Sequence, residues 1–393
     1  MRYVCSECGT RSQDGNVWCQ RVTCSARYLN TQFRAGDHFG EWVIVKPLRV
    51  MRTAALYEAM HGDQKVLLKV AHPGDDSFAE AIKWEAQKLH ELYRRAANKK
   101  NYPVYLPRLV PPAANIDLHS DKAMPYGRLV YRERLCYFIV LEHIDGFFLR
   151  DLLDHNPHPT YNNAGWTALQ LLSALKFLKD NLGIHHLNLN PELVYVRVDL
   201  AGVYFPVLLD LGLGQAVQRR IPAYDRIVAN TPLDEAASIP VQFQDWLHRH
   251  CPLPYIAPEL YQGSGDAQTE LYGVGLIFYE MLAGHPAFEL RIGAEEDLRA
   301  AIAEHRFKPL RHREDELHSI VNRALRTPHN QPYESFTHMA TSLLKRFGDV
   351  PPEKRRESWW SRRNQQRVMI GALVVIVTLV LLAVPSIFGL IAV

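Results

Sequence analysis

Four cysteines near the start of the chain have a spacing that could hold a metal ion. Cys5 and Cys8 form a Cys-x-x-Cys pair followed by a glycine, and Cys19 and Cys24 follow within a short stretch. Thiolates in such a group suit tetrahedral zinc. Four protein ligands leave no open position for water, so we predict a structural zinc in a ribbon-like segment at residues 1–30. The alternative is four unliganded cysteines in an unstructured leader.

The other end of the chain has the chemistry of a membrane anchor, because residues 368–393 include no charged side chain. At a rise of about 1.5 Å per residue, roughly 20 apolar residues cross a bilayer core. The preceding residues 348–367 are rich in arginine and lysine, which favours the cytoplasmic side. We predict a basic juxtamembrane linker followed by a single transmembrane helix, with the body of this tail-anchored protein in the cytoplasm at the cell membrane. The alternative is a buried core helix.

The overall composition is that of a globular protein with no strong charge bias. The 393 residues are 47% hydrophobic and 22% charged, and 45 basic against 42 acidic side chains give a net charge of +3. A protein that binds nucleic acid by bulk charge needs a large basic excess, so no nucleic-acid partner is expected.

Between the two ends, short apolar runs give way to helical patterns. We predict strands at residues 42–45, 65–70 and 136–141, because these runs are short, apolar and β-branched. A helix capped by Ser77 should carry apolar positions from Phe78 to Leu92 at helical spacing. Residues 98–127, rich in Pro, Asn and Asp, are predicted to form a loop insertion.

Helical patterns dominate the second half of this region, at residues 166–182, 271–283, 298–304 and 317–325. Strands first and helices later indicate an α+β domain at residues 40–347 with two lobes. The strand-rich lobe is expected at about residues 40–143 and the helical lobe at about 144–347.

Seven blocks along this region, taken in order, resemble the signature blocks of the protein kinase family, in particular of bacterial-type Ser/Thr kinases. They contain Lys69, Glu85, Glu142 and residues 186–193, 210–212, 255–259 and 269–275. The resemblance implies a two-lobed kinase fold. It also implies that Lys69, held by Glu85, faces nucleotide phosphates, that Glu142 lies in the interlobe hinge, and that Asp210 could bind magnesium.

Several catalytic positions of the family are occupied by residues that cannot do the family's chemistry. The catalytic aspartate position is Asn188, and a carboxamide cannot accept a proton near neutral pH, a loss of typically about 10²–10⁴-fold. The second metal-binding position is Leu193, which has no donor oxygen, and the catalytic lysine position is Asn190.

Substitutions also affect the loop that approaches the phosphates and a later ion pair. The three glycine positions of that loop are Arg49, Met51 and Ala54, whose side chains obstruct a close approach of the backbone to phosphate. Glu259 matches an acid that pairs with a late arginine, but the matching position is Gln331, so we predict that this ion pair is absent.

A kinase fold without its catalytic groups indicates a membrane-anchored pseudokinase, a cytosolic signalling scaffold or allosteric partner of unidentified proteins. Weak ATP and magnesium binding through Lys69 and Asp210 remains compatible with this interpretation. Two alternatives stay open. One is an atypical or weakly active Ser/Thr kinase that uses Asp210 and one metal, and the other is a protein-docking module built on the zinc ribbon.

Overall fold

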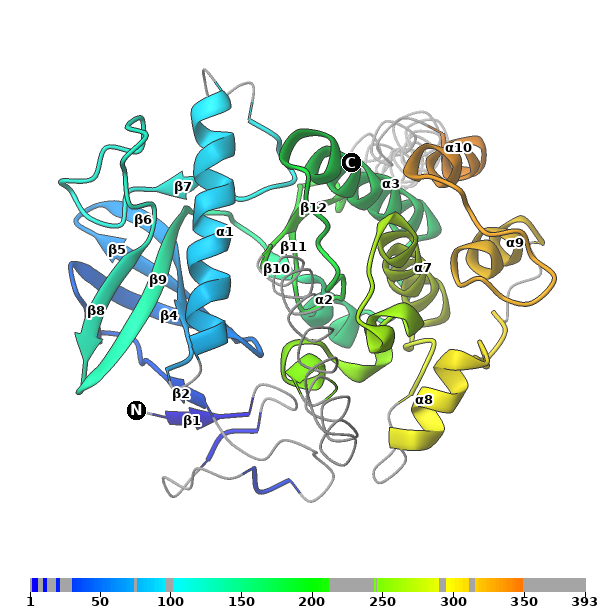
Figure 1. Ribbon diagram of the computed structural model, residues 1–393, viewed down its shortest axis with the longest axis horizontal. Helices are drawn as coiled ribbons and strands as arrows, with labels where there is room; N and C mark the ends of the chain where they lie inside the picture. The colour runs from blue at the N-terminus through cyan, green and yellow to red at the C-terminus, as the bar shows by residue number, and fades with distance from the viewer. Residues whose placement is uncertain are drawn as a thin grey trace, which may run out of the picture.

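The computed structural model describes residues 2–5, 10–12, 19–21, 30–73, 76–96, 102–211, 244, 246–289, 295–310 and 315–348. A strand-rich part with one long helix lies beside a helical part (Figure 1). Cys8, Cys24 and the predicted membrane segment at 368–393 lie outside the described residues. Within the described ranges, no helix is both long and apolar enough to cross a membrane.

A seven-stranded antiparallel sheet is the main element of the first part. Its strands are β3 (His38–Phe39), β4 (Trp42–Val50), β5 (Ala54–His61), β6 (Gln64–Ala71), β7 (Leu109–Val110), β8 (Gly127–Tyr131) and β9 (Arg134–Glu142). Neighbouring strands follow the order β3-β4-β5-β6-β9-β7, and β8 also pairs with β9, along residues 134–138. The predicted strands at 42–45, 65–70 and 136–141 lie within β4, β6 and β9.

Register in the sheet decides which side chains share a face. Leu56 pairs with Lys69, and Lys69 pairs with Ile139, so these three point to the same side. The alternate residues point to the outer side, where they pack with Val4, Phe33 and Trp42 in a second apolar cluster. A two-stranded ribbon of β1 (Arg2–Val4) and β2 (Asn30–Gln32) belongs to the same outer side.

Helix α1 (Asp76–Arg95) covers the inner face of the sheet (Figure 1). Ile82, Glu85 and Leu89 are all buried and lie three or four residues apart, which places them on one face of the helix. The helical periodicity therefore puts the carboxylate of Glu85 in an otherwise apolar stripe. The expected Ser77 cap is wrong, because Ser77 lies inside the first turn of the helix and its hydroxyl contacts His250.

The second part is mainly helical, with a small sheet on its inner side. The helices of eight or more residues that are described here are α3 (Tyr161–Phe177), α7 (Ala267–Ala283), α8 (Glu295–Ala303), α9 (Asp315–Ala324) and α10 (Phe336–Phe347). The small sheet has the order β10 (Phe147–Phe148), β11 (Val194–Val198) and β12 (Tyr204–Leu208), and the short α2 (Leu149–His155) follows β10.

Polar side chains define where the helices of this part begin. Thr160, Asp266 and Ser335 each accept a backbone hydrogen bond at the start of α3, α7 and α10, which satisfies amides that have no partner inside the helix. Helix α7, which begins at the Asp266 cap, lies in the middle of this part, and almost every one of its residues is buried.

Close packing of α3 against α10 depends on Gly165. A Cβ atom on Gly165 would lie 2.3 Å from the buried ring of Phe347. We predict that Gly165→Ala lowers the free energy of unfolding by about 1–3 kcal/mol, although alanine normally favours a helix over glycine. Urea unfolding of the full chain in detergent measures the change. Combining it with Phe347→Leu, which makes room for the methyl group, should recover part of the loss, and full additivity would contradict this account.

Candidate functional site

Lys69, Glu85 and Asp210 meet between the large sheet, helix α1 and the loop that follows β12. Lys69 Nζ lies 2.5 Å from Glu85 Oε2 and 2.9 Å from Asp210 Oδ1. The backbone amide of Asp210 donates to Glu85 Oε1 at 2.9 Å. The side chains of Lys69 and Glu85 have no exposed area, and that of Asp210 is 6% exposed. We call these three residues the buried triad.

The electrostatics of the triad follow from one cation between two carboxylates. Burial opposes the charge on Lys69, but Asp210 and Glu85 outweigh it and raise the pKa of Lys69. Burial also opposes the charge on Asp210, yet the ammonium beside it lowers the pKa of Asp210. Burial, with the charge of Asp210 nearby, raises the pKa of Glu85 despite its contact with Lys69. The three groups therefore stabilise one another only as a set.

The turn between β4 and β5 folds onto the triad. The hydroxyl of Thr53 donates to Asp210 Oδ2 at 3.3 Å, so both carboxylate oxygens of Asp210 have a partner. Met51 and Ala54 have no exposed area. His72 holds the same turn, because its Nε2 is 2.8 Å from Met51 O and its backbone amide donates to Thr53 O at 3.0 Å. The β4–β5 turn thus covers the buried triad.

Arg49, at the end of β4, joins the two parts of the molecule. Its guanidinium is 2.8 Å from Asp151 and 3.6 Å from Glu192, and it lies over the ring of Phe148. An arginine at this position therefore binds the helical part of the same chain.

Apolar side chains fill the inner face of the sheet beside the triad. Leu56, Leu67 and Leu141 have no exposed area, and neither does Leu211, which follows Asp210. Full burial means that no water-sized space touches these side chains. A ligand could reach the ammonium of Lys69 only if some of these residues moved.

The loop that contains Asn188 is held by amide hydrogen bonds. Asn190 Nδ2 donates to Asn188 Oδ1 at 3.1 Å and to Asn188 O at 2.9 Å. Asn188 Nδ2 in turn donates to His250 O at 3.1 Å. His186 is 2.9 Å from Leu209 O through its Nε2. The carboxamide of Asn188 thus has both a donor and an acceptor bond inside the protein.

Residues 246–251 form a segment over this loop in which all but His248 and Arg249 are buried. His248 O accepts a hydrogen bond from Arg52 at 2.8 Å, and His250 lies 3.3 Å from the hydroxyl of Ser77. Trp246 and Cys251 are almost fully buried. This segment therefore contacts the β4–β5 turn, the start of α1 and the Asn188 loop together.

Comparisons with known proteins found similarity to protein kinases. No protein-family model matches the chain. It is 26% identical over 224 residues to the serine/threonine-protein kinase PknB of Mycobacterium tuberculosis, covering 55% of this chain and 31% of that protein. The chain is protein-kinase-like. It is also 29% identical over 157 residues to a probable PknB of Bifidobacterium longum, with 40% and 19% covered.

A human relative extends the same comparison. Ribosomal protein S6 kinase alpha-4 is 28% identical over 162 residues, which cover 41% of this chain and 18% of that protein. The kinase-like chain thus spans less than a third of the length of each of these relatives.

The other predicted site residues are Glu142 and the four cysteines proposed to bind zinc. Glu142 lies at the end of β9, where its carboxylate is 3.4 Å from Arg108, so it is not part of the triad. Cys5 is buried and Cys19 is half-buried, and the other two proposed zinc ligands are outside the described residues. Among the residues that are described, no three His, Cys, Asp or Glu side chains are placed to hold a metal ion.

The predicted loss of the Glu259 ion pair is wrong. Arg326 donates to Glu259 Oε1 at 3.0 Å and to Oε2 at 2.8 Å. The partner comes from the end of α9 and not from the Gln331 position, so the kinase-like chain keeps the interaction with a shifted arginine. Arg326 Nη2 contacts both carboxylate oxygens, and this ion pair ties the segment before α7 to the rest of the helical part.

Three residues of the site were missed by sequence reasoning. Thr53, His72 and His250 lie outside the blocks that resemble kinases, and each is an ordinary residue in its local pattern. Their contacts with Asp210, Met51 and Asn188 become visible only once the chain is folded.

The triad should behave as a structural group. We predict that Lys69→Met lowers the free energy of unfolding by about 3–5 kcal/mol, because it leaves two buried carboxylates without their cation. Lys83→Met is the matched control, since Lys83 forms a partly exposed pair with Glu80 and should cost less than about 1 kcal/mol. Urea unfolding of both variants measures the difference. Equal, small effects would mean that the Lys69 ammonium is solvated.

His72 should make stability depend on pH. Burial lowers the pKa of His72 to about 4, so below about pH 6.5 the unfolded chain binds a proton that the folded chain does not. Stability is then complete above about pH 6.5 and falls as the pH drops toward 4. The wild type should lose about 2–3 kcal/mol more over this interval than His72→Gln, by urea unfolding at a series of pH values. Parallel pH profiles would contradict the burial of a neutral imidazole.

Proposed function

We propose that this protein-kinase-like chain is a pseudokinase that acts as a membrane-anchored signalling scaffold or allosteric partner in the cytoplasm. The observation that carries the proposal is Asn188, which stands where kinases have their catalytic carboxylate. Its amide is bound to His250 O and Asn190, so this side chain neither accepts a proton nor points free into a cleft. The predicted zinc segment and tail anchor belong to the same proposal.

The residues present do not fit ATP and magnesium. Both oxygens of Asp210 already have partners in Lys69 and Thr53, and Leu193 offers no metal ligand. The ammonium that would bind phosphate has no exposed area. Magnesium needs several oxygen ligands in octahedral geometry, and among the described residues every carboxylate oxygen of the triad already accepts a hydrogen bond. We therefore assign no phosphoryl-transfer step to these residues.

One observation favours the weakly active kinase as a second candidate. The Lys69–Glu85 pair, which active kinases require, is formed with a distance of 2.5 Å. In this chain, however, the same lysine also contacts Asp210 directly, and the β4–β5 turn covers all three groups. The Lys69–Glu85 pair therefore supports retention of the kinase-like fold more strongly than it supports retention of phosphoryl transfer.

A nucleotide titration tests whether the site is closed to ATP. The full chain in lipid nanodiscs is heated with millimolar ATP and Mg²⁺, and with Mg²⁺ and tripolyphosphate as the control. We expect no rise in unfolding temperature, whereas a ligand at about 100 times its Kd would add about 2.7 kcal/mol of stability. A rise that is specific to ATP would show that the site opens to nucleotide, and would make the phosphotransfer assay the deciding test between the two candidates.

Restoring the lost catalytic groups gives a second test of the same proposal. The double variant Asn188→Asp, Leu193→Asn returns the proton acceptor and one metal ligand of the family. We expect no transfer of radiolabelled phosphate from ATP to a generic Ser/Thr peptide, because the closed triad still excludes the nucleotide. Phosphotransfer by the wild type, or by this variant, would show that the site opens enough for catalysis.

A further inference from the structure

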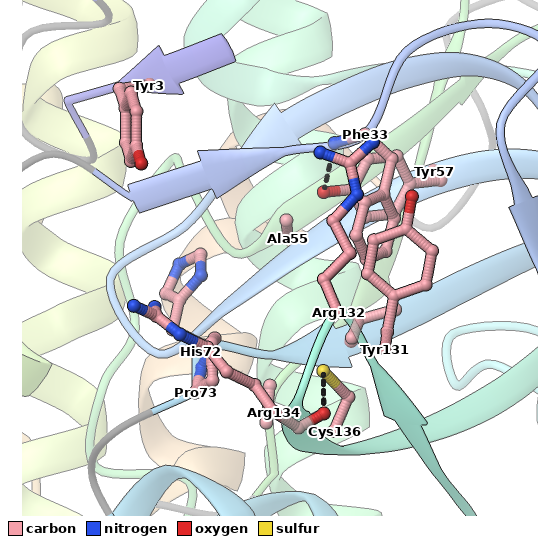
Figure 2. A pocket seen from close by; sticks show the side chains of 12 residues that line it. Tyr3, Phe33, Ala55, Tyr57, His72, Pro73, Tyr131, Arg132, Arg134 and Cys136 are labelled. Atoms are coloured by element: carbon pink, nitrogen blue, oxygen red, sulfur yellow. Dashed lines mark hydrogen bonds between the residues drawn. The ribbon is translucent and has the colours of Figure 1, made fainter. Parts of the chain in front are cut away.

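The outer face of the sheet contains a cavity that the proposed function does not use. Its volume is about 190 Å³, and it lies on the side of the sheet opposite the buried triad. Figure 2 shows the residues that line it, which come from β1, from the segment after β2, from β5 and β6, and from the β8–β9 hairpin. A cavity of about 150 Å³ accommodates benzene, so this one has room for a single substituted ring.

The walls of the cavity are aromatic and its floor is made of small residues. The ring of Phe33 lies 5.1 Å from that of Tyr57 and 4.8 Å from that of Tyr131, measured between centroids. Ala55 and Val70 line the floor, and both are buried. Aromatic pairs at such separations favour a further ring in a stacked or edge-on position.

Two arginines supply charge at the rim. In Figure 2 the side chain of Arg132 extends toward Phe33, and that of Arg134 extends toward His72 and Pro73. Both residues are exposed, and neither guanidinium forms an ion pair with any carboxylate that the structure describes. None of the described residues that line the cavity is acidic. Guanidinium groups match carboxylates in a planar, bidentate geometry.

The hairpin that presents these arginines has a strained backbone. Arg132 and Glu133 form the tip between β8 and β9, with φ angles of 48° and 66°. Two-residue hairpin turns of this kind normally use Asn and Gly, and other side chains cost about 1 kcal/mol or more there. An Asn-Gly tip would relieve the strain but would remove Arg132 from the rim.

We propose that this cavity binds a small aromatic carboxylate. Its ring would lie over Ala55 against the aromatic cluster that contains Phe33 and Tyr131, and its carboxylate would contact Arg134. The inference does not depend on whether the interlobe site is catalytic, because the cavity is on the other face of the sheet.

A matched pair of fluorinated probes tests the proposal on the full chain in nanodiscs. Para-trifluoromethylbenzoate and the uncharged para-trifluoromethylbenzyl alcohol have the same ring, and fluorine NMR titration gives the Kd of each. We expect the benzoate to bind at least about 10-fold more tightly than the alcohol, from its charge-assisted hydrogen bonds. Equal affinities, or the same signal changes with empty nanodiscs, would overturn the proposal.

Substitutions at the rim and the floor of the cavity test whether the probes bind there. Arg134→Gln should weaken the benzoate by about 10-fold and leave the alcohol unchanged, because it removes one guanidinium from the rim. Arg128→Gln is the matched control, since Arg128 is an exposed arginine of β8 that does not line the cavity, and it should leave both affinities unchanged. Ala55→Leu should weaken both probes by filling the floor. An Arg128→Gln loss as large as that of Arg134→Gln would show nonspecific attraction to the arginines.

Discussion

A buried lysine that must keep both of its carboxylates is the constraint on which the interlobe region depends. Lys69 comes from β6, Glu85 from α1 and Asp210 from the loop after β12, so one ammonium joins three separate segments. Removing such charges from water costs several kcal/mol for each ion, and only good geometry offsets that cost. The contacts of the triad are therefore needed to keep the charges paired, and they also hold the two parts of the molecule together.

The surrounding residues close this site and leave no open phosphate cradle. Thr53 binds the second oxygen of Asp210, His72 holds the turn that carries Thr53, and Arg49 binds the helical part. On the other side, His250 binds the amide of Asn188. These contacts hold the β4–β5 turn and the Asn188 loop in place around the triad. His72 also lines the outer cavity, so the two sites share a side chain.

Sequence reasoning found the triad through the resemblance to the kinase signature blocks. Lys69, Glu85 and Asp210 match three of those blocks, and the structure brings the three side chains together. Thr53 and His250 could not be found this way, since their partners are 157 and 62 residues away and each looks ordinary locally. Arg326 was missed for a different reason, because the expected partner of Glu259 was sought at one fixed position and the fold accepts another. The zinc and membrane predictions concern residues mainly outside the described ranges.

The chemical reactivity of Lys69 tests the closed triad most directly. A trace of acetic anhydride acetylates only neutral, accessible amines, and mass spectrometry of the folded full chain compares Lys69 with Lys83. We predict that Lys69 is modified at least about 100-fold more slowly than Lys83, with or without ATP and Mg²⁺, because it is fully buried and its ion pairs raise its pKa. Modification of Lys69 at a rate similar to that of Lys83, with protection by ATP, would contradict the account and indicate an open nucleotide site.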